Sequence, residues 1–294
     1  MRTFEEIATS EVVLAQGLIR YRQLGVGEPI VLVHGLLTNS LLWAPVAQRL
    51  AQDFKVIVPD WPLGSHSVPL APDADMSPPG LAQLIADFLD ALDLDQVTLV
   101  GNDTGGALCQ LVAVHHPARI GRLVLTPCDA YENFLPPILR PFQLSGWVPG
   151  MVWLVANSLR PRFAQRLPYT FGWLSKRPIE KRVMRAFLAP ALRDRRIRCD
   201  LARTLRGIRK RYTLEAAEHF GDFHKPVLVA WASEDRIFKL SDAEKLAGAF
   251  PDARLERIDD SRTFVPIDQP ERTASLIGEF ARPKGGASVQ AGSR

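Results

Sequence analysis

One short stretch of the chain combines a carboxylate with the small residues of a very tight turn. In Val-Gly-Asn-Asp-Thr-Gly-Gly at residues 100–106, an apolar run ends, glycines flank an aspartate, and a helical pattern begins. A turn of this kind between a strand and a helix holds its central residue in a strained conformation and projects the side chain outward. We therefore expect the Asp103 carboxylate to attack an electrophilic carbon or to accept a proton. The simpler alternative is that Asp103 only caps the N-terminus of the helix.

The elements around Asp103 alternate between strand and helix patterns. Continuous apolar, β-branched runs predict buried strands, and apolar residues spaced by three and four predict helices. The predicted strands are residues 27–34, 54–58, 96–100, 119–125, 225–231 and 253–258, and the predicted helices are residues 43–51, 81–92, 106–116, 241–250 and 270–280. This alternation predicts an α/β fold with a mostly parallel, doubly wound sheet that is covered by helices on both faces.

The stretch between the fourth and fifth predicted strands breaks this alternation. Residues 131–222 are rich in arginine, punctuated by proline and helical in pattern. We expect this segment to form a helical cap over the carboxyl ends of the strands, where doubly wound sheets place ligands. The α/β core then comprises residues 1–130 and 223–281. The tail, residues 282–294, is rich in Gly, Ser and Ala and is expected to be disordered.

The turn at Asp103 resembles the nucleophile elbow of the α/β-hydrolase superfamily, in its aspartate branch, which includes haloalkane dehalogenases and epoxide hydrolases. Further motifs occur in the order that this family shows. They are His34-Gly35 after a strand, Asp-Trp-Pro-Leu-Gly-Ser at 60–65, Trp-Ala-Ser-Glu-Asp at 231–235, and the segment 260–271. The resemblance implies that the backbone N–H groups of Leu36 and Thr104 form an oxyanion hole beside Asp103. It implies no metal and no organic cofactor.

The last of these motifs lacks the histidine that the family places before a phenylalanine, because Thr263 precedes Phe264 here. In the family's mechanism, an aspartate forms an ester and a histidine then activates the water that cleaves it. His66, in a loop expected near the carboxyl ends of the strands, is the candidate replacement; a histidine that only braces its loop is the alternative. The resemblance assigns the acid of the relay to Asp235 or to Asp129, which follows the fourth predicted strand.

Residues that would bind the substrate carry a weaker signal. Thr104 stands where haloalkane dehalogenases place a tryptophan and fluoroacetate dehalogenases an arginine, and Leu37 stands where epoxide hydrolases place a proline. The expected substrate is therefore no more specific than a small to medium apolar molecule with an electrophilic carbon. We take Asn39, Trp147 and His34 as candidates to line its pocket. Plain packing is the alternative for Trp147, and bracing of a turn is the alternative for His34.

Composition limits the class of protein further. The chain has 294 residues, of which 47% are hydrophobic and 23% charged, so it resembles neither disordered nor multispan membrane proteins and is long enough to bury a core. Three cysteines without a CxxC pair indicate neither a disulfide framework nor a zinc site and fit a reducing compartment. The N-terminus lacks the pattern of a secretory signal, so we expect a cytoplasmic protein.

The net charge of +4 hides a strong asymmetry. Residues 140–211 hold 18 basic and 3 acidic side chains, a net charge of +15, and the remaining residues sum to −11. This basic cap has three interpretations: it attracts anionic substrates or an acidic partner, it contacts anionic lipid, or it is simply a solvated surface. Nucleic acid is not an expected partner, because no known binding motif accompanies the charge. The sequence does not indicate an oligomeric state.

The sequence is compatible with three functions. The first is a hydrolase that uses Asp103 as nucleophile. The second is a hydrolase fold that has lost turnover with its histidine and binds a ligand or partner through its cap. The third is a lyase or cyclase in which Asp103 acts as a base and no ester forms, so that a histidine is not needed.

Overall fold

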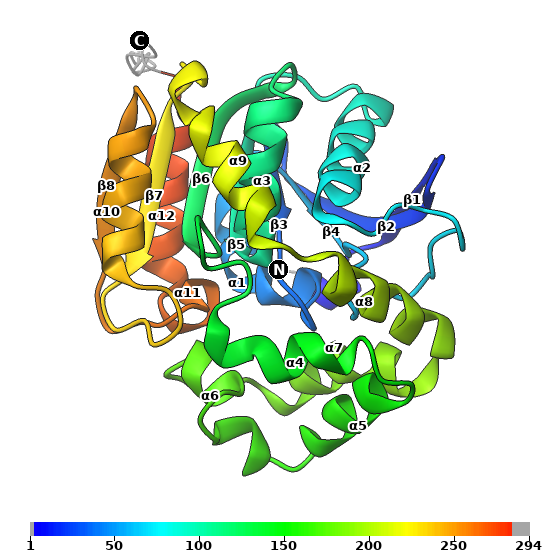
Figure 1. Ribbon diagram of the computed structural model, residues 1–294. Helices are drawn as coiled ribbons and strands as arrows, with labels where there is room; N and C mark the ends of the chain where they lie inside the picture. The colour runs from blue at the N-terminus through cyan, green and yellow to red at the C-terminus, as the bar shows by residue number, and fades with distance from the viewer. Residues whose placement is uncertain (1–2, 284–294) are drawn as a thin grey trace, which may run out of the picture.

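The computed structural model describes residues 3–283, and one eight-stranded sheet forms its centre (Figure 1). The strands lie in the order β1-β2-β4-β3-β5-β6-β7-β8. Their bounds are β1 (Thr9–Leu14), β2 (Gly17–Leu24), β3 (Pro29–Val33), β4 (Lys55–Pro59), β5 (Val97–Asp103), β6 (Ile120–Cys128), β7 (Val227–Ala232) and β8 (Ala253–Ile258). β2 pairs antiparallel with β1 and with β4, whereas all other neighbours are parallel. The predicted mostly parallel sheet is therefore confirmed.

Helices cover both faces of this sheet (Figure 1). One face carries α2 (Pro78–Ala91), α3 (Thr104–His115) and α10 (Leu240–Ala249), and the other carries α1 (Ala44–Leu50) and α12 (Pro270–Ala281). Successive side chains of a strand point to opposite faces, so a strand between two helical layers must be apolar throughout. In β3, Val31 and Val33 enter the first core, and Ile30 and Leu32 enter the second.

The order of the strands reverses next to β3. β4 pairs with one side of β3, and β5, which follows in the chain, pairs with the other side. Doubly wound sheets bind ligands at the carboxyl ends of the strands beside such a point. Here Leu36 lies shortly after the end of β3, and β5 ends on Asp103. The topology thus brings the predicted nucleophile and one predicted oxyanion donor together.

The segment between β6 and β7 is helical; most of it lies at one end of the sheet, and its last helix returns beside α3 (Figure 1). Its α-helices are α4 (Arg140–Ser145), α5 (Met151–Ser158), α6 (Phe171–Leu174), α7 (Lys181–Arg193), α8 (Arg195–Gly207) and α9 (Lys210–Glu218). Side chains of this segment share a cavity with Leu36 and Asp103. The segment therefore lies over the carboxyl ends of β3 and β5, and we use the name cap for residues 131–222.

Two expectations from the sequence concern the C-terminal tail and membrane-spanning helices. Of the tail expected to be disordered, residues 284–294 lie outside the described residues. Within residues 3–283, no helix combines the length and the apolar character that a membrane crossing requires.

Candidate active site

Asp103 occupies a strained turn between β5 and α3. Its backbone angles are φ 55° and ψ −134°, a region that non-glycine residues seldom adopt. The turn closes only because its neighbours lack side chains: a Cβ at Gly105 would lie 2.4 Å from the His34 carbonyl oxygen, and one at Gly106 would lie 2.3 Å from Cβ of Cys128. The Asp103 side chain does not cap the first turn of α3. Within that turn it accepts a hydrogen bond only from the N–H group of the adjacent Thr104. Its carboxylate is therefore available for another role.

The Asp103 carboxylate lies against the backbone after β3. It accepts hydrogen bonds from the N–H groups of Thr104 and Leu36, and Gly35 lies so close that an added Cβ would be 2.1 Å from Oδ2 of Asp103. The pKa of Asp103 is raised to about 7, mainly by burial and also by the negative charge of Asp235, although the two N–H groups oppose the rise. The two backbone donors predicted from the sequence thus already hold the carboxyl group.

Thr263 occupies the position next to the predicted acid. Its hydroxyl donates to Oδ2 of Asp235 at 2.9 Å, and the N–H groups of Ile237 and Phe238 both donate to Oδ1 of Asp235 at 2.7 Å. Burial raises the pKa of Asp235 to about 6, although these three donors oppose the rise. The Thr263 carbonyl also accepts from Nδ2 of Asn102, which precedes Asp103 in β5, at 2.7 Å. Thr263 therefore contacts the acid through its hydroxyl and the strand before the elbow through its carbonyl.

Asp129, the second candidate acid, lies on the other side of the elbow. The Thr104 hydroxyl donates to its Oδ2 at 3.1 Å, and its buried Oδ1 has no hydrogen-bond partner within residues 3–283. Burial raises the pKa of Asp129 well above its usual value, and the charge of Asp103 raises it further. The structure thus gathers three carboxyl groups, those of Asp103, Asp129 and Asp235, whose mutual repulsion and burial favour protonation.

Within residues 3–283, the hydrogen bonds of the His66 ring go to its own loop and to the cap and not to Asp103. Nδ1 of His66 accepts from the Gly64 N–H at 3.4 Å, and Nε2 lies 3.2 Å from Oδ2 of Asp200 in the cap helix α8. Asp200 also accepts from the Leu70 N–H at 3.0 Å. With both ring nitrogens engaged, His66 braces its loop against the cap, which is the alternative that the sequence left open.

His34 has a bracing role as well. Its Nε2 accepts from the Trp61 N–H at 2.9 Å, and its Nδ1 lies 2.9 Å from the Gly35 carbonyl oxygen. Burial lowers the pKa of His34 to about 4, so the ring is neutral at neutral pH. The ring fixes the turn that supplies the Leu36 N–H, and both of its nitrogens are occupied in doing so.

An apolar cavity of about 200 Å³ lies above Asp103. Its lining comprises Leu36, Leu37 and Asp103 from the core and Leu135, Leu139, Phe142, Val155, Ser158, Leu159, Tyr169, Thr170, Phe171 and Leu174 from the cap. Asp103 is the one acidic side chain in this lining, and no basic side chain contributes to it. Sites of this kind bind apolar molecules and use a few polar groups for orientation or reaction.

Asn39, Trp147 and His34, predicted to line the pocket, lie outside this cavity. Asn39 instead joins the core to the cap, because its Nδ2 donates to the Ala186 carbonyl at 3.3 Å and its Oδ1 accepts from the Leu41 N–H at 3.1 Å. Trp147 lies on the cap surface with 57% of its area exposed. No sequence motif identifies the leucines and Phe142 as residues that line the cavity. The available signal for a pocket in this region was the apolar character of residues 141–156.

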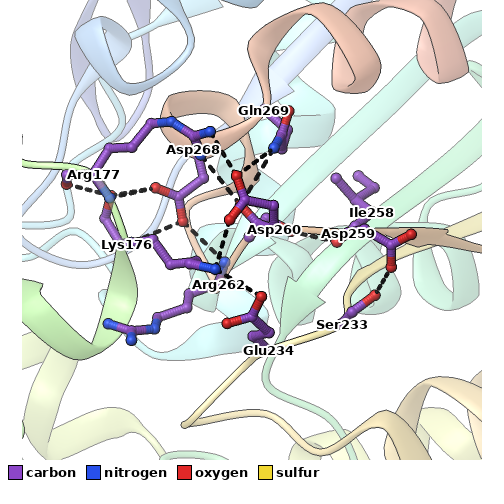
Figure 2. A network of polar contacts seen from close by, with 12 residues as sticks. Lys176, Arg177, Ser233, Glu234, Ile258, Asp259, Asp260, Arg262, Asp268 and Gln269 are labelled. Carbon is purple, nitrogen blue, oxygen red and sulfur yellow. Dashed lines mark hydrogen bonds and ion pairs between the residues drawn. The ribbon is translucent and has the colours of Figure 1, made fainter.

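A polar network fixes the loop that carries Thr263 (Figure 2). Its centre is the buried Asp268 carboxylate, which accepts four hydrogen bonds. The donors are the Ser175 hydroxyl at 2.8 Å and the backbone N–H groups of Lys176, Arg177 and Arg262 at 2.9 Å each. Asp260 adds ion pairs to Lys176 at 2.6 Å and Arg177 at 2.8 Å. The loop after β8 is thereby tied to cap residues 175–177, which restricts movement at position 263.

Comparisons with known proteins agree with this architecture. A family model described as alpha/beta hydrolase fold matches residues 28–270. Haloalkane dehalogenase 2 of Mycobacterium tuberculosis is 27% identical over 276 residues, covering 90% of this chain and 92% of the relative. Poly(3-hydroxyalkanoate) depolymerase of Ectopseudomonas oleovorans is 28% identical over 265 residues, covering 86% and 83%. Cis-3-alkyl-4-alkyloxetan-2-one decarboxylase of Shewanella oneidensis is 25% identical over 271 residues, covering 89% and 84%.

Solved structures show the same fold. A meta-cleavage product hydrolase from Pseudomonas fluorescens has a TM-score of 0.76 and 20% identity and covers 94% of this chain and 98% of its own. The epoxide hydrolase CorEH has a TM-score of 0.75 and 17% identity with the same coverage. The matched family model spans the elbow, the strand that ends on Asp103 and the loop that carries Thr263. The chain therefore belongs to the alpha/beta hydrolase family, whose members are generally hydrolytic enzymes.

Proposed function

We propose that this protein forms a covalent ester between Asp103 and a small to medium apolar substrate with an electrophilic carbon. The observation that carries the proposal is the position of the Asp103 carboxyl group, which the Leu36 and Thr104 N–H groups hold at the floor of an apolar cavity. One carboxylate oxygen attacks the carbon, and the leaving group departs with the bonding electrons, as halide or as the alkoxide of an opened epoxide. The two N–H groups orient the other oxygen, and they stabilise it when water later attacks the ester.

The second step, hydrolysis of the ester, lacks its usual base. Water must lose a proton while it attacks the ester carbonyl, and Thr263 cannot accept that proton at neutral pH. Thr263 itself hydrogen-bonds to Asp235, the group that would orient a histidine at this position. We therefore infer that the ester forms and is cleaved slowly, so that it accumulates.

A second candidate function is general-base catalysis by Asp103 without an ester. The pKa of Asp103, raised by burial to about 7, supports it, because a base works best when its pKa lies near the working pH. In this reaction Asp103 removes a proton from a carbon or a hydroxyl group of the substrate and returns it to the product. Substrate then turns over while the mass of the protein stays unchanged.

Intact-protein mass spectrometry separates these functions. The protein is incubated with short-chain 1-bromoalkanes and 1,2-epoxyalkanes, with Asp103→Asn as the control. We expect the native protein to gain the mass of the alkyl or hydroxyalkyl group and the variant to gain nothing. Consumption of bromoalkane to an alkene without added mass would support the base, whereas consumption to an alcohol or a diol without added mass would contradict accumulation of the ester. Neither consumption nor added mass would contradict both reactions and favour a binding role.

The variant Thr263→His tests the slow second step. A histidine at this position finds the Asp235 carboxylate within the reach that the Thr263 hydroxyl now uses, 2.9 Å. We expect the variant to release product repeatedly and to show less accumulated ester than the native protein. Thr263→Gln is the matched control, because its side chain is of similar size but accepts no proton at neutral pH. Equal ester lifetimes in the two variants would refute the explanation by a missing base.

A further inference from the structure

Large apolar side chains are exposed on one part of the cap. Eight such side chains occur between residues 144 and 169, with 41% to 72% of their area exposed. They are Leu144, Trp147, Val148, Trp153, Leu154, Phe163, Leu167 and Tyr169, and we call this set the apolar rim. The other two exposed large apolar residues within residues 3–283, Val13 and Val26, belong to the edge of the sheet and its following loop. Concentration of apolar surface in one region is typical of an interaction surface.

A basic groove of about 850 Å³ runs between α5, the loop after it, and α7. Five cations and no acidic residue line it: Arg160, Arg162, Lys181, Arg185 and Arg193. The side chains of four of them, all except Arg160, make no ion pair or hydrogen bond within residues 3–283. The Arg160 guanidinium donates only to Oδ1 of Asn157 at 3.3 Å. Cations gathered without counter-charges repel one another, so the groove favours an anionic partner.

Helix α5 joins the groove to the cavity above Asp103. With 3.6 residues per turn, Trp153 and Asn157 lie on one side of the helix and line the groove, and Val155 and Ser158 lie on another and line the cavity. Leu154 lies between these two sides and is 51% exposed. α5 is also far from the sheet, at the outer part of the cap (Figure 1). One exposed helix edge therefore separates the cations from the cavity.

We propose that the apolar rim and the basic groove dock this protein on an anionic phospholipid bilayer, with the edge of α5 at the lipid surface. Aromatic and aliphatic side chains enter the boundary between headgroups and acyl chains, while unpaired arginines and lysines bind lipid phosphates. An acidic protein would match the charge, but an exposed set of leucines, tryptophans and phenylalanine that offers few hydrogen bonds fits lipid better.

Docking in this orientation places the cavity beside the lipid surface. Val155 and Ser158, which line the cavity, lie on the same helix as rim residues Trp153 and Leu154. Tyr169 belongs to the rim and also lines the cavity. An apolar substrate dissolved in the bilayer then reaches Asp103 without crossing water. This second statement rests on the proposed function of Asp103, whereas docking itself does not.

Sedimentation with lipid vesicles tests the docking. Vesicles of phosphatidylcholine alone are compared with vesicles that contain phosphatidylglycerol, at low and high salt. We expect binding to the anionic vesicles and its loss at high salt, because screening shortens the range of the charges. Arg162→Glu with Arg193→Glu should weaken binding by at least about thirtyfold, because each cation near an anionic surface contributes roughly fivefold. Lys55→Glu with Arg254→Glu, at the other end of the sheet, is the charge-matched control.

The apolar contribution needs a separate pair of variants. Leu154→Ser with Phe163→Ser should also weaken binding, whereas Val13→Ser with Val26→Ser, more exposed but outside the cap, should not. Absence of binding to anionic vesicles, or equal loss in the variants and their controls, would overturn the proposal. Asp103→Asn should bind vesicles like the native protein, so that failure of docking and failure of the proposed chemistry are seen in different assays.

Discussion

Replacement of Asp103 by asparagine should make the protein more stable, and more so as the pH rises. Burial raises the pKa of Asp103 in the folded state to about 7, from a usual value of 3.8. The folded protein therefore holds a proton that the unfolded chain has lost between about pH 4 and pH 7. Stability contributed by this proton is full below pH 4 and falls as the pH rises to 7, after which the loss is constant. Asp103→Asn removes the charge and with it this loss.

The size of the effect follows from the two pKa values. Ionisation of Asp103 lowers the free energy of unfolding by roughly 2 kcal/mol at pH 5 and by roughly 4 kcal/mol at pH 8. The substitution also changes hydrogen bonds to Leu36 and Thr104, but that contribution does not depend on pH. The advantage of the variant over the native protein should therefore grow by about 2 to 3 kcal/mol between pH 5 and pH 8.

Urea unfolding of both proteins at several pH values measures this difference. Asp129 and Asp235 titrate in both proteins. The difference between the two proteins therefore reports the titration of Asp103 and its electrostatic coupling to these two groups. We expect the two curves of stability against pH to diverge from about pH 4 and to run parallel above pH 7. Curves that stay parallel over the whole range would show that Asp103 is ionised at its usual pKa and would refute the reasoning about its burial.

Three further substitutions test the neighbours of this carboxyl group. Gly35→Ala should reduce ester formation at least about a hundredfold in the mass assay, because the new Cβ would lie 2.1 Å from Oδ2 of Asp103 and must displace it. Asp235→Asn should move the midpoint of the pH profile of ester formation below about 7, because it removes a charge that raises the pKa of Asp103; an unchanged midpoint would contradict the coupling. Asp268→Ala should lower the free energy of unfolding by about 3 kcal/mol or more in urea, since four donors lose their acceptor; a smaller loss would show that water replaces it.

The core of the fold was predictable because its strands are apolar on both faces. β3 and β5 read as continuous apolar runs, and the helices between them show the spacing of one buried face. The hairpin formed by β1 and β2 was not predicted. Its residues are largely exposed or half-buried at the edge of the sheet, so they lack the apolar run that marks a central strand.

The elbow and the missing histidine were also readable, because both depend on neighbours in the sequence. The orientation of the His66 ring could not be predicted from the sequence, because Asp200, which orients it, lies in the cap and 134 residues away in the chain. Asn39 similarly turns toward Ala186 in α7. The lining of the cavity was missed for the same reason: it comes mainly from cap helices whose packing on the core no local pattern specifies.

Formation of the ester at Asp103 should itself change how the stability of the protein depends on pH. An ester at Asp103 is neutral, so its formation removes the same buried charge as Asp103→Asn does, and it does so between two other buried carboxyl groups. The alkylated protein should therefore lose the decrease in stability between pH 5 and pH 8 that the native protein shows, a gain of about 4 kcal/mol at pH 8. Urea unfolding of the mass-shifted protein measures this gain. If the pH dependence persists after complete alkylation, the added group is on another residue or the Asp103 carboxyl was never protonated, and peptide mapping of the adduct distinguishes the two. Relief of this charge favours the ester over the free carboxylate at equilibrium, whereas the absence of a base at position 263 accounts for the slow rate of its hydrolysis.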